Sequence, residues 1–473
     1  MAKQKTPPLT FKVYLCSLGC PKNRVDSEVI LAALQRLPTT VWEITPDPSS
    51  ADIILVNTCA FIDAAQEESI NTILELSTAK HPTASAASSS PPFLVVTGCL
   101  EQRYPQELPQ LLPEVDLFLP ASHQPFINNY FSVQNKRLHF NPHPGLPAAP
   151  AAEKLPYYAR TALPRHLTTL PGTAWLKIAE GCNRRCTFCA IPHFKGRYVS
   201  RKMQVLLQEA QDLVKQGVQE INLVAQDLSG YGRDLGLKNG LIHLVQKLAQ
   251  IKDLKWIRLL YIYPEGITPE LIKLLQNTPK VCPYLDIPIQ HLSPKILKAM
   301  GRRISPAAIK QRIAQLRKAI PQISLRTSIL VGFPGEDEQD LAVLQQGLTE
   351  LQFDHLGVFA YSPQAGTTAA ELPGQIPLKE KNRRQKLIYK LQKKIITARL
   401  KKLKGTTTTA ILEGPHPETD LLVQARLITQ APDVDEKVMI TELQQPHQVG
   451  DIIRVTITQV KGMEIAAQET TWS

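Results

Sequence analysis

Three short apolar stretches near the amino terminus are each followed within two residues by a cysteine, and this arrangement constrains the fold more than any other feature. The stretches and their cysteines are 11–18 with Cys20, 51–58 with Cys59, and 93–97 with Cys99. Helical patterns at about 24–37 and 63–79 lie between them. Alternating strands and helices predict a parallel sheet, whose strands all end along one edge. Cysteines far apart in the sequence are therefore expected to meet there.

A second set of three cysteines is compact. Cys182, Cys186 and Cys189 form a C-x3-C-x2-C run soon after another apolar stretch. Each set is one ligand short of a closed four-coordinate site. Three thiolates on a [4Fe–4S] cluster leave one iron open to substrate or cofactor, as catalytic metal sites leave one position open. The two sets predict two reactive metal centres.

Other roles for these and neighbouring cysteines stay open. His193 is close enough in sequence to complete a zinc site with the compact set. Cys16 lies on the same strand parity as Cys20 and is an alternative ligand, although a buried strand cysteine is the more frequent role. Cys282 has no partner in the sequence and is interpreted in the same way.

Composition limits the class of protein. No run approaches the ~18 apolar residues that a membrane span needs, and the first ten residues are polar. We therefore expect a soluble, cytoplasmic protein without a membrane partner. Eight cysteines in such a chain indicate metal or redox chemistry more often than a disulfide framework.

The positive charge is concentrated in one segment. The net charge is +12, and residues 379–404 hold twelve Lys or Arg against the single acid Glu380. The segment is predicted to be one long helix, with an apolar stripe along Leu387, Leu391, Ile395 and Ala398. Its charge is either the solvated face of a helix docked on its own protein or a patch that contacts RNA.

The pattern divides the chain into an N-terminal parallel α/β domain (9–135), a linker (136–170), a central domain (171–403) and a small β-barrel (404–471). A Ser/Ala/Pro-rich stretch at 81–92 is expected to be a mobile surface loop.

Strands of the central domain are predicted at 175–179, 220–225, 256–263, 284–290, 325–331 and 355–361, and helices at 203–216, 241–250, 269–276, 306–319 and 337–351. Six such units predict a partial (β/α)6 barrel whose mouth is the carboxyl edge of its strands. Four barrel strands are predicted at 406–412, 421–429, 437–443 and 451–460.

Several motifs together resemble those of the radical S-adenosylmethionine (SAM) methylthiotransferases. The compact set lies in a stretch that runs from Lys177-Ile-Ala-Glu-Gly-Cys182 through Phe188-Cys189-Ala-Ile-Pro192 to Ser200-Arg201. The dispersed set lies in Leu18-Gly-Cys20-Pro-Lys-Asn23, followed by Asp26-Ser-Glu28, in Asn57-Thr-Cys59-Ala-Phe61 and in Thr97-Gly-Cys99. The final barrel is similar to the TRAM domain of that family. The resemblance covers nearly the whole chain.

The resemblance implies two [4Fe–4S] clusters. Cys182, Cys186 and Cys189 would hold the cluster that binds SAM and, once reduced, splits it to a 5′-deoxyadenosyl radical. Cys20, Cys59 and Cys99 would hold an auxiliary cluster that carries the sulfur. A second SAM would supply the methyl group, and flavodoxin or ferredoxin would supply electrons. No catalytic residue is assigned beyond these ligands.

Five further residues are candidates for the SAM pocket. Phe188 offers a flat apolar face to a purine base. Gln226 and Asp227, at a strand end, could receive the methionine amine or the ribose, and Asp227 could equally form a turn. Gly332 and Gly335 would let the backbone approach adenosine, and a simple strand-to-helix turn is the alternative.

The substrate is predicted from the branch of the family. Residues 284–291, Tyr361-Ser362-Pro363 with Gly366-Thr367, and residues 431–435 resemble the branch called RimO, which modifies the β-carbon of an aspartate in ribosomal protein uS12. The transfer-RNA (MiaB-type) branch usually reads Gln-Ser-Gly-Ser where this chain has Gln290-His291-Leu292-Ser293. His291 itself is interpreted as a histidine packed at a strand end.

Two alternatives to the RimO-type interpretation remain. One is a transfer-RNA adenosine methylthiotransferase. The other is a non-catalytic, metal-stabilised RNA-binding protein, which would explain the basic segment and the final barrel. It would not explain two separate sets of three thiolates.

Overall fold

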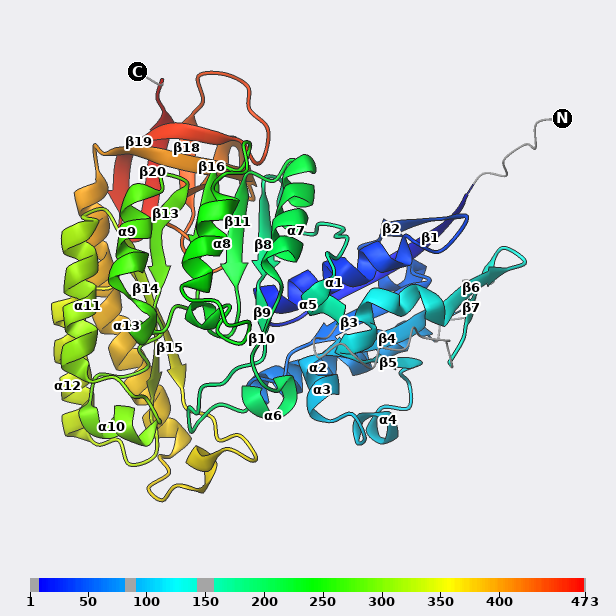
Figure 1. Cartoon of the computed structure of the whole chain (residues 1–473), viewed down its shortest axis with the longest axis horizontal. Coiled ribbons are helices and arrows are strands. Elements are labelled where there is room, and N and C mark those ends of the chain that lie inside the picture. Colours follow the sequence, from blue (N-terminus) through cyan, green and yellow to red (C-terminus); the bar gives the residue numbers. More distant parts are fainter. Residues whose placement is uncertain (1–7, 81–90, 143–156, 472–473) are drawn as a thin grey trace. The chain divides into compact units, whose positions relative to one another are not determined.

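The computed structural model describes residues 8–80, 91–142 and 157–471 (Figure 1). It divides into two compact units: Met1–Thr168 with Ala190–Val205, and Thr169–Cys189 with Leu206–Ser473. Almost all of the loop expected at 81–92, and the centre of the linker expected at 136–170, lie outside the described residues. Within those residues, none of the helices combines the length and the apolar composition needed to span a bilayer.

The first unit contains the predicted parallel sheet. Its strands are β1 (Leu9–Ser17), β2 (Thr40–Ile44), β3 (Ile53–Thr58), β4 (Phe93–Gly98) and β5 (Leu117–Leu119), in the order β2-β1-β3-β4-β5. Its helices are α1 (Pro21–Leu34), α2 (Asp63–Ser77), α3 (Cys99–Arg103), α4 (Leu108–Leu111), α5 (Tyr157–Arg160) and α6 (Ile191–Lys195). The short strands β6 (Phe131–Gln134) and β7 (Arg137–Phe140) form a hairpin, and β10 is Val199–Ser200. The sequence missed β2 and β5, the two edge strands of the sheet.

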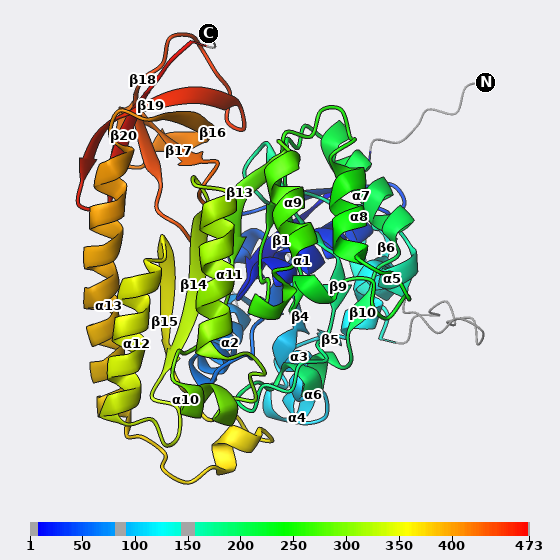
Figure 2. The ribbon, with the colours of Figure 1, turned by 60° about the vertical axis from the view of Figure 1, so that its left-hand side comes forward.

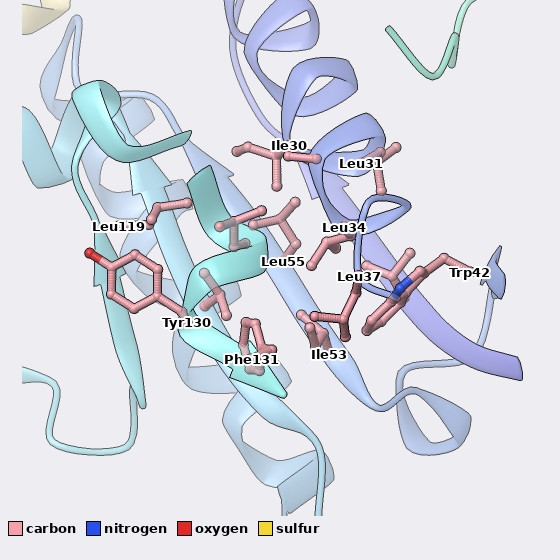
Figure 3. Packing of buried hydrophobic residues seen from close by; sticks show 14 of the residues in the cluster. Ile30, Leu31, Leu34, Leu37, Trp42, Ile53, Leu55, Leu119, Tyr130 and Phe131 are labelled. Carbon is pink, nitrogen blue, oxygen red and sulfur yellow. The ribbon is translucent and has the colours of Figure 1, made fainter. Parts of the chain in front are cut away.

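The sheet is buried on both faces, because every residue of β3 is buried. Ile53 and Leu55 belong to one hydrophobic cluster and Ile54 and Val56 to another, as the alternation of side chains along a strand requires. Figure 3 shows the first cluster, with residues of α1 such as Leu34 packed over β3. Strands buried on both faces are typical of parallel sheets covered by helices.

The second unit contains the predicted six-stranded parallel sheet. Its strands are β8 (Thr173–Lys177), β11 (Glu220–Val224), β12 (Trp256–Leu259), β13 (Val281–Asp286), β14 (Ser324–Val331) and β15 (His355–Ala360), and each pairs with the next. The two-residue strand β9 (Ala179–Glu180) follows β8. The central sheet of a partial (β/α)6 barrel is therefore confirmed.

The predicted helices of this region agree with the structure within about two residues. They are α7 (Met203–Lys215), α8 (Gly240–Leu248), α9 (Pro269–Asn277), α11 (Pro306–Ala319) and α12 (Glu338–Leu351), with the additional short helix α10 (Pro294–Ala299). The sequence marks several starts: Thr268, Ser293 and Ser305 each cap a helix with their side chain, and a proline follows. This pairing of a hydroxyl cap with proline is a strong helix-start signal.

Two strand predictions were wrong at their ends. β13 begins at Val281 and includes Pro283, although a proline argues against a central strand. The pairing of β12 with β13 shifts register between Ile257 and Leu259, and this irregularity accommodates the proline. β12 ends at Leu259, four residues early, because Tyr261 has a left-handed φ of 59°.

The C-terminal strands close into the predicted small barrel. They are β16 (Thr407–His416), β17 (Thr419–Leu427), β18 (Val438–Glu442), β19 (Ile452–Lys461) and β20 (Glu464–Glu469), in the order β16-β17-β18-β20-β19, with β19 also paired to β16. The fifth strand, β20, was not predicted. Its alternation of buried Ile465 and Ala467 with more exposed neighbours is too short to be distinctive.

The basic segment forms one helix, α13 (Leu378–Leu400), which packs against α12 and β15 and leads into the barrel (Figure 2). The predicted apolar stripe was wrong: Leu387 and Leu391 are only half-buried and Ala398 is exposed. Its buried residues are Lys381, Arg384, Ile388, Gln392, Ile395, Ile396 and Leu400. Polar side chains share this face because their ends find partners: Lys381 Nζ donates to the Tyr361 carbonyl (2.8 Å) and Gln392 Nε2 to that of Phe353 (2.9 Å).

Candidate functional site

The dispersed cysteines lie at the carboxyl ends of three adjacent strands. Cys20 follows β1 and precedes the first turn of α1, Cys59 follows β3 directly, and Cys99 follows β4 as the first residue of α3. Gly19 lets the end of β1 approach β3 closely. A side chain there would meet Cys59 Cβ at 2.9 Å and Cys59 Sγ at 3.1 Å, and its φ of +87° also favours glycine.

Asn23 ties these strand ends together. Its Nδ2 donates to the carbonyls of Leu18 (3.1 Å) and Thr58 (2.8 Å), the residues that follow β1 and end β3. Its Oδ1 lies 3.8 Å from Sγ of both Cys20 and Cys99, so one buried amide contacts two of the three thiols. From the sequence, Asn23 is recognised only as part of the motif around Cys20. The available signal was an asparagine, a poor helix former, in the first turn of a helix that follows a candidate ligand.

Burial raises the pKa of one dispersed thiol and of two cysteines outside both sets. Burial raises the pKa of Cys59, and the neighbouring Cys20 adds to the effect. Burial also raises the pKa of Cys16, which packs against the hydrophobic cluster that contains Ile54, Val56 and Val96. These contacts support the structural interpretation of Cys16. Cys282 is likewise fully buried, and its pKa is raised to about 12.

The compact cysteines lie in a loop held by backbone hydrogen bonds. The amide of Arg184 donates to Cys182 Sγ (3.4 Å), and the amide of Cys189 donates to the carbonyl of Cys186 (3.2 Å). Thr187 fixes the loop to the end of α10 through the carbonyls of Met300 (3.1 Å) and Ala299 (2.8 Å). Burial raises the pKa of Cys182, and nearby Asp227 and Cys186 contribute.

A tyrosine between two arginines lies beside this loop. The guanidinium carbons of Arg184 and Arg302 lie 4.2 Å and 4.4 Å from the centre of the Tyr263 ring. Tyr263 Oη and Arg302 Nη1 are each 3.7 Å from Cys186 Sγ. Burial, followed by the Cys186 thiol, holds the pKa of Tyr263 well above its usual value, so the phenol keeps its proton. Neither Tyr263 nor Arg302 could be predicted from the sequence, because both lie far from the compact cysteines along the chain.

Two of the predicted SAM residues connect to the same loop. Arg184 Nε donates to the Asp227 carboxylate (2.8 Å), which is buried. Gln226 Nε2 donates to Glu180 Oε1 (3.2 Å), while Gln226 Oε1 is buried without a partner among the described residues. A buried amide oxygen without a donor is unusual and marks a place where a ligand N–H or O–H would be stabilised.

The other predicted residues have clearer structural roles. The amide of Gly332 donates to Glu336 Oε2 (2.8 Å), and a Cβ there would lie 2.4 Å from Lys381 Cγ. These contacts support the turn alternative for Gly332. Gly335 has a φ of +77°, and a Cβ at this position would meet no described atom within 4 Å, so space remains beside it. Phe188 is partly buried against the hydrophobic cluster that contains Met300 and Phe333.

His291 is buried as expected, but it lies five residues beyond Asp286, where β13 ends, and not at the strand end. Its side chain is fully buried, and its Nδ1 accepts a hydrogen bond from the amide of Ser293 (2.9 Å). Burial lowers its pKa to about 4. His291 is therefore neutral near pH 7.

Three family descriptions match successive parts of the chain. Residues 12–120 match the uncharacterized protein family UPF0004, residues 176–346 the Radical SAM superfamily, and residues 405–469 the TRAM domain. The first match contains the dispersed cysteines and the second contains the compact ones. These two families indicate a protein that uses SAM and iron–sulfur chemistry.

The chain is also similar in sequence and fold to known proteins. A ribosomal protein uS12 methylthiotransferase RimO from Geobacter sulfurreducens is 45% identical over 97% of this chain and 98% of the relative. Relatives of the same name from Geotalea uraniireducens and Acetivibrio thermocellus are 42% and 40% identical at the same coverage. The structure of the radical SAM methyltransferase TsrM from Kitasatospora setae, at 14% identity, has a similar fold, with a TM-score of 0.54 over 77% of each chain. Identity of this degree over nearly the full length establishes common descent, and the chain therefore belongs to the radical SAM methylthiotransferases of the RimO family.

Proposed function

We propose that this protein adds a methylthio group to the β-carbon of an aspartate in ribosomal protein uS12. The observation that carries the proposal is the presence of two separate sets of three cysteines, each following a strand of its own parallel sheet. A radical enzyme that only abstracts hydrogen needs one such set. A second set provides a place for sulfur. The names of the full-length relatives support uS12 as the substrate.

The dispersed set fits an auxiliary [4Fe–4S] cluster held by Cys20, Cys59 and Cys99. The close approach of Gly19 to Cys59, and the single amide that contacts two thiols, support a shared ligand for the three. No group of three His, Cys, Asp or Glu side chains that could hold a metal ion occurs among the described residues. Cysteines that bind different irons of one cluster lie farther apart than ligands of one ion, so this finding is compatible with a cluster.

The compact set fits the cluster that binds SAM, held by Cys182, Cys186 and Cys189. When bound, the two groups would supply reductive cleavage of SAM at the compact set and a site for sulfur at the dispersed set. The chain's own contribution is positional. Arg184 holds the Asp227 carboxylate in place, and the unpartnered Gln226 Oε1 is suited to accept from the methionine amine of SAM. Tyr263 and Arg302 direct an O–H and an N–H toward Cys186 Sγ.

Electron supply and location complete the proposal. Reductive cleavage requires a one-electron donor of low potential, for which flavodoxin or ferredoxin is suited. No disulfide joins any of the eight cysteines, which is typical of a reducing compartment, so we propose that the protein acts in the cytoplasm.

The cluster assignment is tested by replacing each set of cysteines. Alanine at Cys182, Cys186 or Cys189 should abolish 5′-deoxyadenosine formation by the anaerobically reconstituted protein with a chemical reductant. Alanine at Cys20, Cys59 or Cys99 should leave the formation of 5′-deoxyadenosine unchanged. It should halve the iron content from about eight iron atoms per chain. Methylthiolation that persists in all three dispersed-set variants would show that the dispersed set is not required for sulfur transfer.

The substrate is tested by mass spectrometry after incubation with SAM, a sulfur source, reductant and either uS12 or transfer RNA. We expect a methylthio mass increase on one aspartate of uS12. The same increase on transfer RNA instead would reverse the choice of substrate. A colourless protein that carries only zinc after anaerobic purification would support the non-catalytic alternative.

A further inference from the structure

The outward face of α13 carries a row of lysines. Lys386, Lys390, Lys393 and Lys394 are exposed along the helix, and the exposed lysines at 401, 402 and 404 continue the row beyond it. None of these lysines makes an ion pair with an acidic side chain of the described residues. The row therefore exposes only positive charge to solvent.

The basic side chains on the inward face of α13 form hydrogen bonds and ion pairs with other parts of the protein. Arg384 Nη1 donates to Glu336 Oε1 (2.9 Å), Lys381 Nζ donates to the Tyr361 carbonyl (2.8 Å), and Arg399 Nε contacts Asp354. These bonds hold α13 on the sheet and explain why some of its basic residues are buried. They do not explain the outward lysines, which take no part in docking the helix.

We infer that the outward face of α13 binds the phosphate backbone of double-stranded RNA. From Lys386 to Lys402 the row spans about 24 Å, given a rise of 1.5 Å per residue. A rigid row of that length matches a uniform polyanion better than a short acidic peptide segment. Double-stranded RNA is recognised largely through its shape, phosphates and 2′-hydroxyls, which cationic side chains on a helix can contact.

The choice of RNA rests on the proposed function, since a ribosomal protein inside its particle is surrounded by RNA. A membrane surface is a poorer match for this face. Interfacial helices insert an apolar face into lipid, whereas Ile388, Ile396 and Leu400 of α13 are buried in the protein. Tyr389 is half-exposed between Lys386 and Lys390, near the start of the row.

The inference is tested with the full-length holoprotein and a fluorescent RNA duplex of about twenty base pairs. The variant K386Q/K390Q/K393Q/K394Q should bind at least tenfold more weakly at about 0.1 M salt. Each phosphate contact contributes roughly 0.7–0.9 to the slope of log K against log salt, so the slope should fall by about three. The matched control K238Q/K247Q/K252Q/K273Q removes four exposed lysines from elsewhere in the same unit and should stay within twofold of wild type.

Unchanged RNA binding by the α13 variant would overturn the inference, and so would equally tight binding of the wild type to polyglutamate. Both variants should keep the thermal unfolding transition of the wild type, and K390E/K394E provides a second probe at two of the positions. Methylthiolation of free uS12 is measured separately. Its absence in the wild type would refute the proposed function alone, while loss of RNA binding in the control as well would refute the assignment to α13.

Discussion

At the scale of single residues, the dispersed cysteines depend on Asn23. Its side-chain amide satisfies two main-chain carbonyls at strand ends while its oxygen faces two thiols. A residue that uses all of its polar atoms in a buried site is hard to replace, because each lost partner leaves a buried group unsatisfied. We therefore expect substitution of Asn23 to disturb the geometry of the three cysteines more than substitution of their hydrophobic neighbours.

Asn23→Ala should lower the free energy of unfolding by about 2–3 kcal/mol, because the carbonyls of Leu18 and Thr58 lose their donor. It should also reduce iron retention at the dispersed set. Urea unfolding and iron analysis measure the two effects. Asn71→Ala, at an exposed position of α2, is the control and should change neither quantity. Full iron content in the Asn23 variant would show that the amide does not position the cysteines.

Tyr263 gives a prediction at the compact set. Tyr263→Phe keeps the ring between Arg184 and Arg302 but removes the hydroxyl 3.7 Å from Cys186 Sγ. Hydrogen bonds to cluster sulfur raise the reduction potential, so the variant should have a more negative potential with unchanged iron content. Redox titration followed by EPR measures the shift. Tyr389→Phe, on the exposed face of α13, should leave the potential unchanged.

At the scale of elements, the barrel is joined to the last strand of the sheet through a buried histidine. His355 at the start of β15 lies 3.2 Å from Asp435 Oδ1 and 3.1 Å from Glu436 Oε2, both in the segment before β18. Burial alone would lower the pKa of His355, but the two carboxylates outweigh burial and raise it. Protonated His355 therefore stabilises the contact between β15 and the barrel.

This arrangement predicts a pH dependence of stability. A histidine whose folded pKa exceeds its unfolded value of about 6.5 contributes fully below that pH, and the contribution is lost as the pH rises through the folded pKa. The urea midpoint should therefore fall as the pH is raised above about 6.5. His355→Gln should flatten this part of the profile, whereas His243→Gln, at an exposed position of α8, should not. An unchanged profile for His355→Gln would exclude this link as the cause.

At the scale of the whole second unit, a buried ion-pair network joins the barrel to the other side of the sheet. Glu220 of β11 contacts Arg258 of β12 (2.9 Å) and Arg426 of β17, and all three side chains are buried. Arg258 also donates to the carbonyl of Ile428 in the barrel (2.8 Å). Burial opposes the charge on Glu220, yet the two arginines lower its pKa to about 2. The Glu220 carboxylate thus pairs with cations from two domains, and Glu413 also pairs with Arg426 (2.9 Å).

Glu220→Gln should destabilise this unit by about 3–5 kcal/mol, because it leaves two buried guanidinium groups without their main counter-ion. Urea unfolding at pH 7 measures the loss. The wild type should also lose stability in acid, since a lowered carboxylate pKa contributes above about pH 4.5 and is lost as the pH falls toward 2. Glu442→Gln, an exposed change in the same barrel, should stay within about 0.5 kcal/mol. An equally small effect at Glu220 would mean that packing alone holds the two domains.

Much of this architecture could be predicted from local patterns. The sheets, most helices and the strand-end positions of the cysteines follow from periodicity and from caps such as Thr268 and Ser305. Errors arose where a distant contact overrides the local preference. Pro283 enters a strand through a register shift, and Lys381 and Arg384 are buried because their charged ends reach partners on neighbouring elements.

The candidate metal ligands and their places after strands can be predicted from local sequence, because side-chain chemistry and hydrophobic period are local properties. The contacts that support those residues depend on the tertiary structure. Asn23 spans two strand ends, Tyr263 lies between two arginines, and Glu220 joins the barrel to the sheet. Such contacts join positions far apart in the chain, and their energy comes from burial and from pairing of charges, which no local pattern encodes.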